Sequence, residues 1–368
     1  MFKLIYKQTN EAKIYDNISC ASKEKIERIL SQESISFTDF LCLLSPLAEA
    51  FLEKMAAKAH AISVQRFGKT IQLYNPIYIS NECNNQCKYC GFRHDSKLER
   101  KTLTLEEFEQ ELEFLLEQGF KNILLVSGEN KKSVNINYLE NIIKKTLEKC
   151  PYVSLEIYPL SLEEYKRLNK AGASGVTIYQ ETYHRETYLA VHGKGTKQNF
   201  DARIDVPDII CQAGYKNIGI GALLGLYDWR YDAAISALHA EYLMKTYWKT
   251  KVSLSIPRLK NVPEDFKIIN PVSDKNLVQI ITAFRIFLPD VGIALSTRES
   301  PELRDNLIPL GITQMSAGSK TNPGGYATSQ GLKQFPVVDD RSTKQVVCAI
   351  MAKGYEPVWK DWDEVFNK

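Results

Sequence analysis

The pattern of apolar and polar positions changes near residue 70. Before that point apolar residues recur at helical spacing, over residues 22–31 and 37–60, and few residues there break a helix. We therefore predict an N-terminal helical extension over residues 1–70. Beyond residue 72, short apolar or β-branched runs alternate with amphipathic segments, which is typical of strands separated by helices.

The predicted strands and helices alternate through most of the chain. The strands are expected at residues 74–80, 122–127, 153–158, 175–180, 217–221, 252–256, 292–296 and 312–316. The helices between them include residues 104–118, 136–149, 161–170, 231–248 and 274–287. A glycine ends several helices just before the next strand, as a C-cap does: Gly119, Gly172, Gly214 and Gly311.

Eight strands joined by single helices predict right-handed βαβ units and a parallel sheet. The expected fold class is therefore α/β, a closed (β/α)8 TIM-type barrel over residues 71–340. A doubly wound open sheet is the alternative. Residues 341–368 are expected to form a C-terminal helix and an aromatic, charged tail that packs on the barrel.

Composition and charge narrow the class of protein. With 44% hydrophobic and 25% charged residues, the chain resembles an ordinary globular protein. A net charge of +3 argues for neither nucleic acid nor an anionic membrane surface as partner. No apolar run approaches the roughly 20 residues of a membrane span, and residues 1–15 lack the apolar centre of a signal peptide. We expect a cytoplasmic protein.

Three of the eight cysteines form a tight cluster directly after the first predicted strand. Cys83, Cys87 and Cys90 have the spacing C-x3-C-x2-C, and no fourth cysteine lies nearby. Three thiolates can hold three corners of an iron–sulfur cubane, which leaves the fourth iron open to an outside ligand. The alternative is a structural zinc site completed by His94.

Polar residues also gather at the ends of the later predicted strands, where a barrel of this class carries its active site. These residues are Ser127, Gly128, Glu129, Glu156, Gln180, Glu181, Thr182, Gly219, Gly221, Arg258, Ser296, Thr297, Arg298, Glu299, Ser316 and Ser319. Charged groups that meet at a barrel mouth favour a polar, zwitterionic ligand. Some have a structural interpretation instead: Glu156 could face outward, Gly219 could relieve crowding, and a rim salt bridge is favoured for Arg258 and for Glu299.

The cysteine spacing is the signature of the radical SAM superfamily, and the whole chain resembles one family within it, the aromatic amino-acid lyases. The resemblance rests on residues 65–68, 83–92, 124–129, 179–184, 295–300, 323–326 and 357–362. It implies a [4Fe–4S] cluster on Cys83, Cys87 and Cys90 and S-adenosyl-L-methionine (SAM) as the second cofactor.

The resemblance also assigns roles to individual residues. Ser127, Gly128 and Glu129 stand where the superfamily binds the methionine amino group of SAM, with Glu156 and Arg203 as further SAM contacts, Arg203 at the carboxylate. Gly219 and Ile220 match a backbone stretch beside the adenine. Tyr89 matches an aromatic residue near the adenine, and simple loop packing is an equal alternative for it. Arg298 matches the position that pairs with the substrate carboxylate, and Ser316 and Ser319 are expected to line the same pocket.

The implied activity is radical cleavage of the Cα–Cβ bond of L-tyrosine, for the thiazole moiety of thiamine. The products are 2-iminoacetate, p-cresol, 5′-deoxyadenosine and methionine. The implied partners are a thiazole synthase and a flavodoxin or ferredoxin as electron donor. A tryptophan lyase of the same family and a non-catalytic iron–sulfur or zinc barrel are the alternatives. A two-cluster hydrogenase maturase fits poorly, because Cys348 is the only cysteine beyond residue 211.

Overall fold

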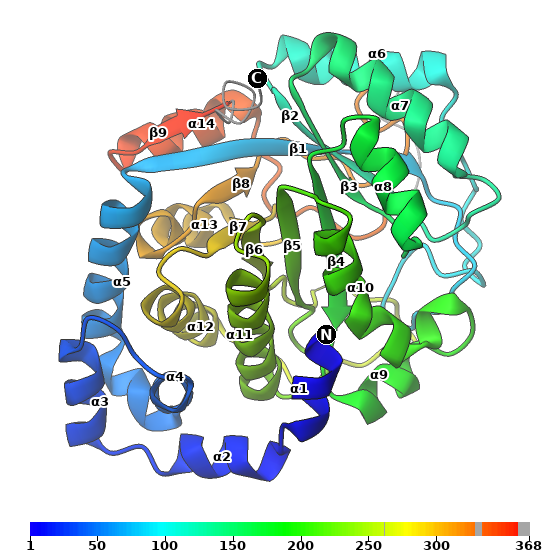
Figure 1. The fold of residues 1–368 in the computed structure, drawn as a ribbon. Helices are drawn as coiled ribbons and strands as arrows, with labels where there is room; N and C mark the ends of the chain where they lie inside the picture. The colour runs from blue at the N-terminus through cyan, green and yellow to red at the C-terminus, as the bar shows by residue number, and fades with distance from the viewer. Residues whose placement is uncertain (261, 328–332, 360–368) are drawn as a thin grey trace.

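A computed structural model describes residues 1–260, 262–327 and 333–359 of the chain. In these residues nine strands form one sheet: β1 (Thr70–Ser80), β2 (Asn122–Ser127), β3 (Tyr152–Glu156), β4 (Gly175–Glu181), β5 (Asn217–Ala222), β6 (Lys251–Ser255), β7 (Gly292–Leu295), β8 (Gln314–Ser316) and β9 (Glu356–Val358). The first eight are parallel neighbours in chain order, and β1 pairs with both β2 and β8. The sheet therefore closes into the predicted (β/α)8 barrel (Figure 1).

Helices surround this barrel and precede it. The N-terminal extension contains α1 (Phe2–Gln8), α2 (Glu11–Ser19), α3 (Lys23–Ser31), α4 (Phe37–Leu43), the 3-10 helix η1 (Pro46–Phe51) and α5 (Leu52–Phe67). The later helices are α6 (Leu105–Glu117), α7 (Ile136–Lys149), α8 (Leu162–Lys170), α9 (Arg185–Val191), η2 (Thr196–Gln198), α10 (Phe200–Gln212), α11 (Trp229–Thr246), α12 (Asp274–Phe287), α13 (Pro301–Leu307), η3 (Ile308–Leu310) and α14 (Thr343–Ala352). The helical character predicted for the start of the chain is confirmed.

Local capping chemistry sets where several barrel helices begin. At α6 the Thr104 side chain accepts a hydrogen bond from the Glu107 amide, and the Glu107 carboxylate accepts one from the Thr104 amide. Ser161 and Glu164 repeat this capping box at α8. Each box satisfies amides that a helix start leaves without partners. The glycines predicted to follow helices all have positive φ: Gly119, Gly172, Gly214 and Gly311.

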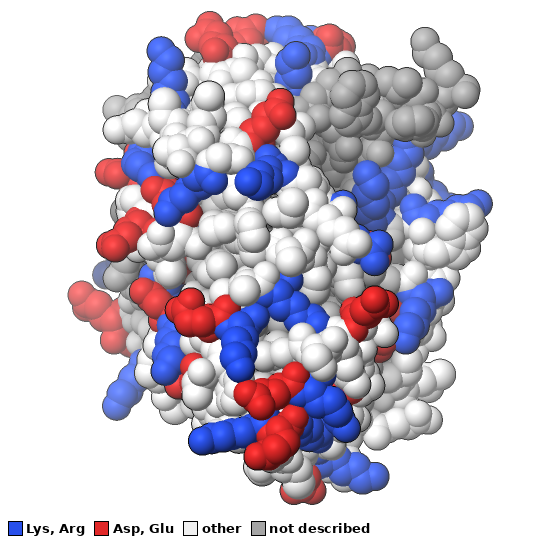
Figure 2. Space-filling view, turned by 90° about the vertical axis from the view of Figure 1, so that its left-hand side faces the viewer, with Lys and Arg blue, Asp and Glu red and all other residues white. Residues whose placement is uncertain are grey.

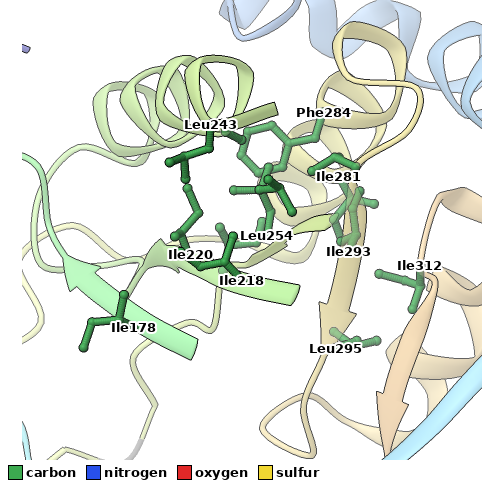
Figure 3. Packing of buried hydrophobic residues seen from close by; sticks show 14 of the residues in the cluster. Ile178, Ile218, Ile220, Leu243, Leu254, Ile281, Phe284, Ile293, Leu295 and Ile312 are labelled. Atoms are coloured by element: carbon green, nitrogen blue, oxygen red, sulfur yellow. The ribbon is translucent and has the colours of Figure 1, made fainter. Parts of the chain in front are cut away.

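The hydrophobic core lies outside the barrel wall, between the strands and the helices. On β5 and β6 the outward residues Ile218, Ile220 and Leu254 are buried. Figure 3 shows them beneath Leu243 of α11 and Phe284 of α12. The alternate, inward positions of the same strands carry small or polar residues. Because strand side chains alternate between faces, one face of each strand packs the fold and the other lines the interior.

Both ends of the described chain pack against the barrel. The ring of Phe2 on α1 is fully buried and stacks on His239 of α11, with centroids 3.8 Å apart. At the other end β9 pairs in parallel with the start of β1, and Trp359 packs edge-on against Phe120. Residues 360–362 of the family resemblance, and the rest of the predicted tail, lie outside the described residues.

Some boundaries differ from the prediction. The first strand begins at Thr70, four residues earlier, because its extension pairs with β9, a contact made with residues almost 300 positions away. The pairing segment of the last barrel strand is shorter than predicted and begins at Gln314. No helix in the described residues is long and apolar enough to cross a membrane. Figure 2 shows basic and acidic side chains interspersed on one face of the molecule.

Candidate active site

The cysteine loop leaves the carboxyl end of β1, and backbone hydrogen bonds connect it to distant segments of the chain. The Asn84 amide donates to the Glu129 carbonyl (3.1 Å), and the Lys88 amide to the Val191 carbonyl (3.0 Å). The Gly91 amide donates to the Gln334 carbonyl (3.2 Å). The loop therefore contacts the segment that follows β2, the end of α9 and a segment from late in the chain.

Cys83, Cys87 and Cys90 line one small cavity of about 90 Å³, which we call the cysteine pocket. Ser127, Gly128, Glu129, Glu156 and Arg203 line it as well. The structure thus brings together the three cysteines and the residues that the sequence associated with the methionine part of SAM.

The donor set fits an iron–sulfur cluster better than zinc. In the described residues no three or more His, Cys, Asp or Glu side chains are gathered so that they could hold one metal ion. His94 is not gathered with the cysteines in this way, and its Nδ1 lies 3.2 Å from the Cys83 carbonyl oxygen. A cubane makes a different demand, because each thiolate binds a different iron atom. Burial raises the pKa of the Cys87 and Cys90 thiols, so their thiolate forms need a bound metal to offset that cost.

Ser127 and Gly128 form the wall of the cysteine pocket opposite the cysteine loop. The Ser127 hydroxyl oxygen is buried and has no hydrogen-bond partner among the described residues. At Gly128 a Cβ atom would lie 2.3 Å from the carbonyl oxygen of Glu82 and 3.2 Å from Cβ of Cys83. Only glycine therefore lets the two loops approach this closely, and the approach leaves an unsatisfied polar group facing the pocket.

Glu129 is fixed by two partners from distant parts of the chain. The Arg203 guanidinium on α10 lies 2.6 Å from one carboxylate oxygen, and the Asn85 amide donates to the other at 2.8 Å. Burial alone would raise the pKa of Glu129, but the charges of Arg203 and Lys197 lower it overall. Glu129 is therefore ionised, and it stands beside a cation that can meet a ligand carboxylate.

A second ion pair lies beside the first. Lys197 Nζ is 2.5 Å from Glu181 Oε1, and both side chains are almost buried. Glu181 is the one described non-glycine residue with positive φ, at 70°. Such a backbone conformation is uncommon for a residue with a side chain and persists where surrounding contacts hold it. The strain is located at the carboxyl end of β4, next to the cysteine pocket.

Above the barrel interior lies a larger pocket of about 350 Å³, which we call the upper pocket. The sequence-predicted residues Arg298, Ser316, Ser319 and Tyr89 all line it, together with Cys90. The guanidinium of Arg298 stacks over the Phe335 ring at 3.5 Å from the centroid. It makes no ion pair with any described residue, so its charge faces the pocket without a counterion.

Two other polar side chains that line the upper pocket already form hydrogen bonds within the protein. The Ser319 hydroxyl bonds Asn75 Oδ1 at 3.0 Å, and the Tyr89 hydroxyl lies 2.7 Å from His192 Nε2. Tyr89 therefore both lines the pocket and packs within the loop. The contact with the adenine stays a prediction.

A third cavity, of about 640 Å³, occupies the lower half of the barrel, and we call it the lower cavity. Inward residues such as Gln72, Ser154, Thr177 and Ser253 line it. Glu156 borders all three cavities. The carboxyl group therefore faces inward, and the alternative of an outward, solvated Glu156 is wrong.

Not every predicted residue lies at these pockets. Gly219 faces the lower cavity, and the Ile220 side chain packs in the outer core; neither lines the cysteine pocket or the upper pocket. Their role beside the adenine stays a prediction. Arg258 and Glu299 form a buried ion pair with each other, and Lys260 adds a second cation 2.7 Å from Glu299. The favoured salt-bridge interpretation is thus confirmed.

Several site residues escaped the sequence analysis. Asn85, Lys197, Gln334 and Phe335 all line these pockets or bind residues that do. Asn85 is the one with a local signal, since it lies within the cysteine loop. Lys197 belongs to a short 3-10 helix, and Gln334 and Phe335 to an irregular segment, so no strand end marks them.

Comparison with known families agrees with this geometry. The Radical SAM superfamily profile matches residues 77–237, and the Biotin and Thiamin Synthesis associated domain matches residues 255–356. The 2-iminoacetate synthase of Escherichia coli K12 is 41% identical over 93% of this chain and 92% of its own length. The enzyme of the same name from Salmonella typhimurium LT2 is 42% identical over 92% and 90%. The chain belongs to the 2-iminoacetate synthase family of radical SAM enzymes.

Membership in the 2-iminoacetate synthase family makes the chain a radical SAM enzyme whose cofactors are a [4Fe–4S] cluster and SAM. Among solved structures, the FeFe-hydrogenase maturase HydG from Carboxydothermus hydrogenoformans superposes with a TM-score of 0.90 at 33% identity. That match covers 98% of this chain and 86% of HydG. Methylornithine synthase, at 22% identity and a TM-score of 0.71, shares the fold.

Proposed function

We propose that the chain is a tyrosine lyase. It cleaves the Cα–Cβ bond of L-tyrosine to 2-iminoacetate and p-cresol, while SAM yields 5′-deoxyadenosine and methionine. The proposal rests on one observation above all: an uncompensated guanidinium, Arg298, faces a partly aromatic pocket that opens beside Cys90. The name of the close relatives supports 2-iminoacetate as the product.

In the cysteine pocket, we assign the cluster to Cys83, Cys87 and Cys90. The unsatisfied Ser127 hydroxyl and the Glu129 carboxylate suit the methionine ammonium, and Arg203 suits its carboxylate. Gly128 keeps that wall close enough for both contacts. When bound, the cluster and SAM supply the radical that starts the reaction.

In the upper pocket, Arg298 binds the substrate carboxylate through two parallel hydrogen bonds. Phe335 lies against the guanidinium plane and holds its orientation. Ser316 and Ser319 border the same space, and Tyr74, Tyr78 and Tyr179 give it an aromatic wall. Reacting atoms must approach to about 3–3.5 Å, so a fixed carboxylate anchor also fixes the amino group for hydrogen abstraction.

The products and the electron balance indicate the partners. Reductive cleavage of SAM consumes electrons, for which we propose a flavodoxin or ferredoxin in the cytoplasm. The imine of 2-iminoacetate hydrolyses readily in water, so an enzyme that consumes it at once is needed. We propose a thiazole synthase, which uses the product for the thiazole moiety of thiamine, in accord with the family match at residues 255–356.

The test is anaerobic turnover with reconstituted cluster, dithionite, SAM and L-tyrosine, followed by assays of 5′-deoxyadenosine and p-cresol. We expect both products from the wild type. Arg298→Ala should keep its cluster and bind SAM, but p-cresol formation should fall roughly a hundredfold because the substrate loses its anchor. Arg28→Ala, an exposed arginine on α3, is the matched control.

Three outcomes would contradict the proposal. Wild-type yields of p-cresol from Arg298→Ala would remove its central residue. Absence of both products would favour a non-catalytic iron–sulfur barrel. Indole-derived products from L-tryptophan, with none from L-tyrosine, would identify a tryptophan lyase instead.

A further inference from the structure

Most charged side chains buried around the upper pocket are already paired within the protein. Lys197 pairs with Glu181, and Lys260 with Glu299. In the described residues Arg298 and Glu156 are the exceptions: neither makes an ion pair, and no hydrogen bond reaches the Glu156 carboxyl group. The unpaired Arg298 and the unpaired Glu156 thus border the same pocket, at which the further unpaired cation Lys333 is exposed to solvent. An amino acid carries the complementary pair of charges.

Glu156 lies at the floor of the upper pocket. It is the last residue of β3, and Tyr74, Tyr179 and Ser255 border the same two cavities as it does, the upper pocket and the lower cavity. The lower cavity extends from there to Trp248, which is 78% exposed at the amino-terminal end of β6. The lower cavity thus runs from Glu156 toward the surface on the side away from the upper pocket, and polar residues such as Gln72, Ser154 and Ser253 form part of its lining.

The surroundings of Glu156 are mixed in charge. The ionisable groups that face it are Glu181, Arg298, Lys197, Arg203, Tyr74, Tyr78 and Tyr179. Burial, with a smaller contribution from Glu181, raises the pKa of Glu156 to about 7, against the pull of the three cations. The carboxyl group can thus gain or lose a proton near neutral pH, as a general base must.

The proposed reaction creates a need for such a group. The α-amino group of a free amino acid is an ammonium at neutral pH and has no lone pair. Hydrogen-atom abstraction at nitrogen, with formation of a nitrogen-centred radical, requires the neutral amine. One proton must therefore leave the ammonium before the radical step.

We propose that Glu156 binds the α-ammonium of the substrate and accepts one proton from it. An N–H bond breaks, its electron pair stays on nitrogen, and the proton passes to the carboxylate oxygen and then to the lower cavity. This role rests on the proposed tyrosine lyase activity. It is an alternative to the SAM contact that the sequence suggested for Glu156, because the residue borders the upper pocket together with the unpaired Arg298 as well as the cysteine pocket.

Binding measurements without turnover distinguish a contact of Glu156 with the substrate ammonium from a contact with SAM. L-Tyrosine and 3-(4-hydroxyphenyl)propionate, which lacks the amino group, are titrated calorimetrically into reconstituted enzyme with SAM and no reductant. Glu156→Gln should bind L-tyrosine at least tenfold more weakly, as expected for a lost charge-assisted hydrogen bond. Binding of the propionate and of SAM should be unchanged. Glu163→Gln, an exposed glutamate on α8, controls for the substitution.

The pH profile tests the proton transfer itself. In the wild type, kcat/KM for p-cresol formation should rise with pH through about 7, since the base must be ionised to act. This limb should vanish in Glu156→Gln and persist, displaced, in Glu156→Asp, which keeps a titratable group. Residual turnover of Glu156→Gln should be at most a hundredth of the wild-type rate.

The results distinguish failure of this proposal from failure of the function. If the wild type neither binds nor cleaves L-tyrosine, the lyase assignment falls. If the wild type cleaves L-tyrosine but Glu156→Gln keeps its affinity and the same pH limb, Glu156 is not the base. Loss of SAM binding in Glu156→Gln, with L-tyrosine binding intact, would return Glu156 to the SAM site.

Discussion

At the scale of single residues, Gly128 decides how closely two loops can meet. Its missing side chain leaves room for the Glu82 carbonyl and for Cβ of Cys83, the first cysteine of the loop. Any Cβ at this position must push the cysteine loop away from the end of β2. Such a displacement should weaken the binding of both the cluster and SAM.

We therefore expect Gly128→Ala to lose cluster occupancy and at least tenfold in SAM affinity, equivalent to about 1.4 kcal/mol. Iron and sulfide content per chain, with equilibrium binding of SAM, would measure this. Gly193→Ala is the matched control, because a Cβ there would meet its nearest neighbour at an ordinary 3.7 Å. Full iron content and SAM binding in Gly128→Ala would show that the loops can separate at little cost.

Residues of the site were predictable where the signal was local. The cysteine spacing and the polar residues after β2 and β7 are readable because they follow strands directly in sequence. The partners that complete them are not local: Arg203 meets Glu129 across 74 positions. Phe335, which stacks on Arg298, lies in an irregular segment. Only the closed barrel brings such pairs together.

At the scale of elements, a buried ion pair connects α13 to the end of β8. Arg304 on α13 binds the Asp339 carboxylate and the Ser316 carbonyl, and both charged side chains are fully buried. Arg341 provides a second cation 2.8 Å from Asp339. Burial alone would raise the pKa of Asp339, but the hydrogen bonds and charges of Arg341 and Arg304 lower it overall.

Asp339→Asn should reduce the free energy of unfolding by about 3–5 kcal/mol, because it leaves Arg304 buried without a counterion. The stability that this pair contributes is present above the ordinary aspartate pKa near 4 and is lost as the pH falls through the lower folded value. Denaturant unfolding at pH 7 measures the first effect. Asp340→Asn, the exposed neighbour, should be neutral, and an equal loss there would refute the assignment to the buried pair.

Several helices and strands have the boundaries predicted from the sequence, and the differences at β1 and β9 arise from pairing between distant segments. Helices α7 and α12 and strand β2 have the predicted boundaries, since their periodicity and caps are local properties. The early start of β1 and the existence of β9 depend on each other, because the two segments pair across the whole length of the chain. Periodicity in one segment carries no information about such a partner.

At the scale of the whole molecule, burial of histidine couples stability to pH. His239 lies beneath the ring of Phe2, where α1 closes over α11. Burial lowers the pKa of His239 to about 3, whereas an exposed histidine titrates near 6.5. In the unfolded chain the imidazole of His239 therefore binds a proton below about pH 6.5, whereas in the folded chain it binds one only below about pH 3.

The free energy of unfolding should thus fall, by about 1.4 kcal/mol per pH unit for this group, as the pH drops below about 6.5. In His239→Gln that slope should be smaller between pH 6 and 4. Denaturant titrations of both proteins across this range provide the measurement, with His60→Gln on α5 as the control substitution. An unchanged slope in His239→Gln would place the pH dependence on other groups.

The alternation along the barrel strands has a practical consequence for variation of this enzyme. Within β3, β5 and β6, Val153, Ile220 and Leu254 pack against the helices, whereas the alternate positions Ser154, Gly219 and Ser253 line the lower cavity. Substitutions at the outward positions should therefore lower stability and expression, whereas substitutions at the inward positions should alter the chemistry. A library confined to inward positions could explore new substrates while the fold stays intact.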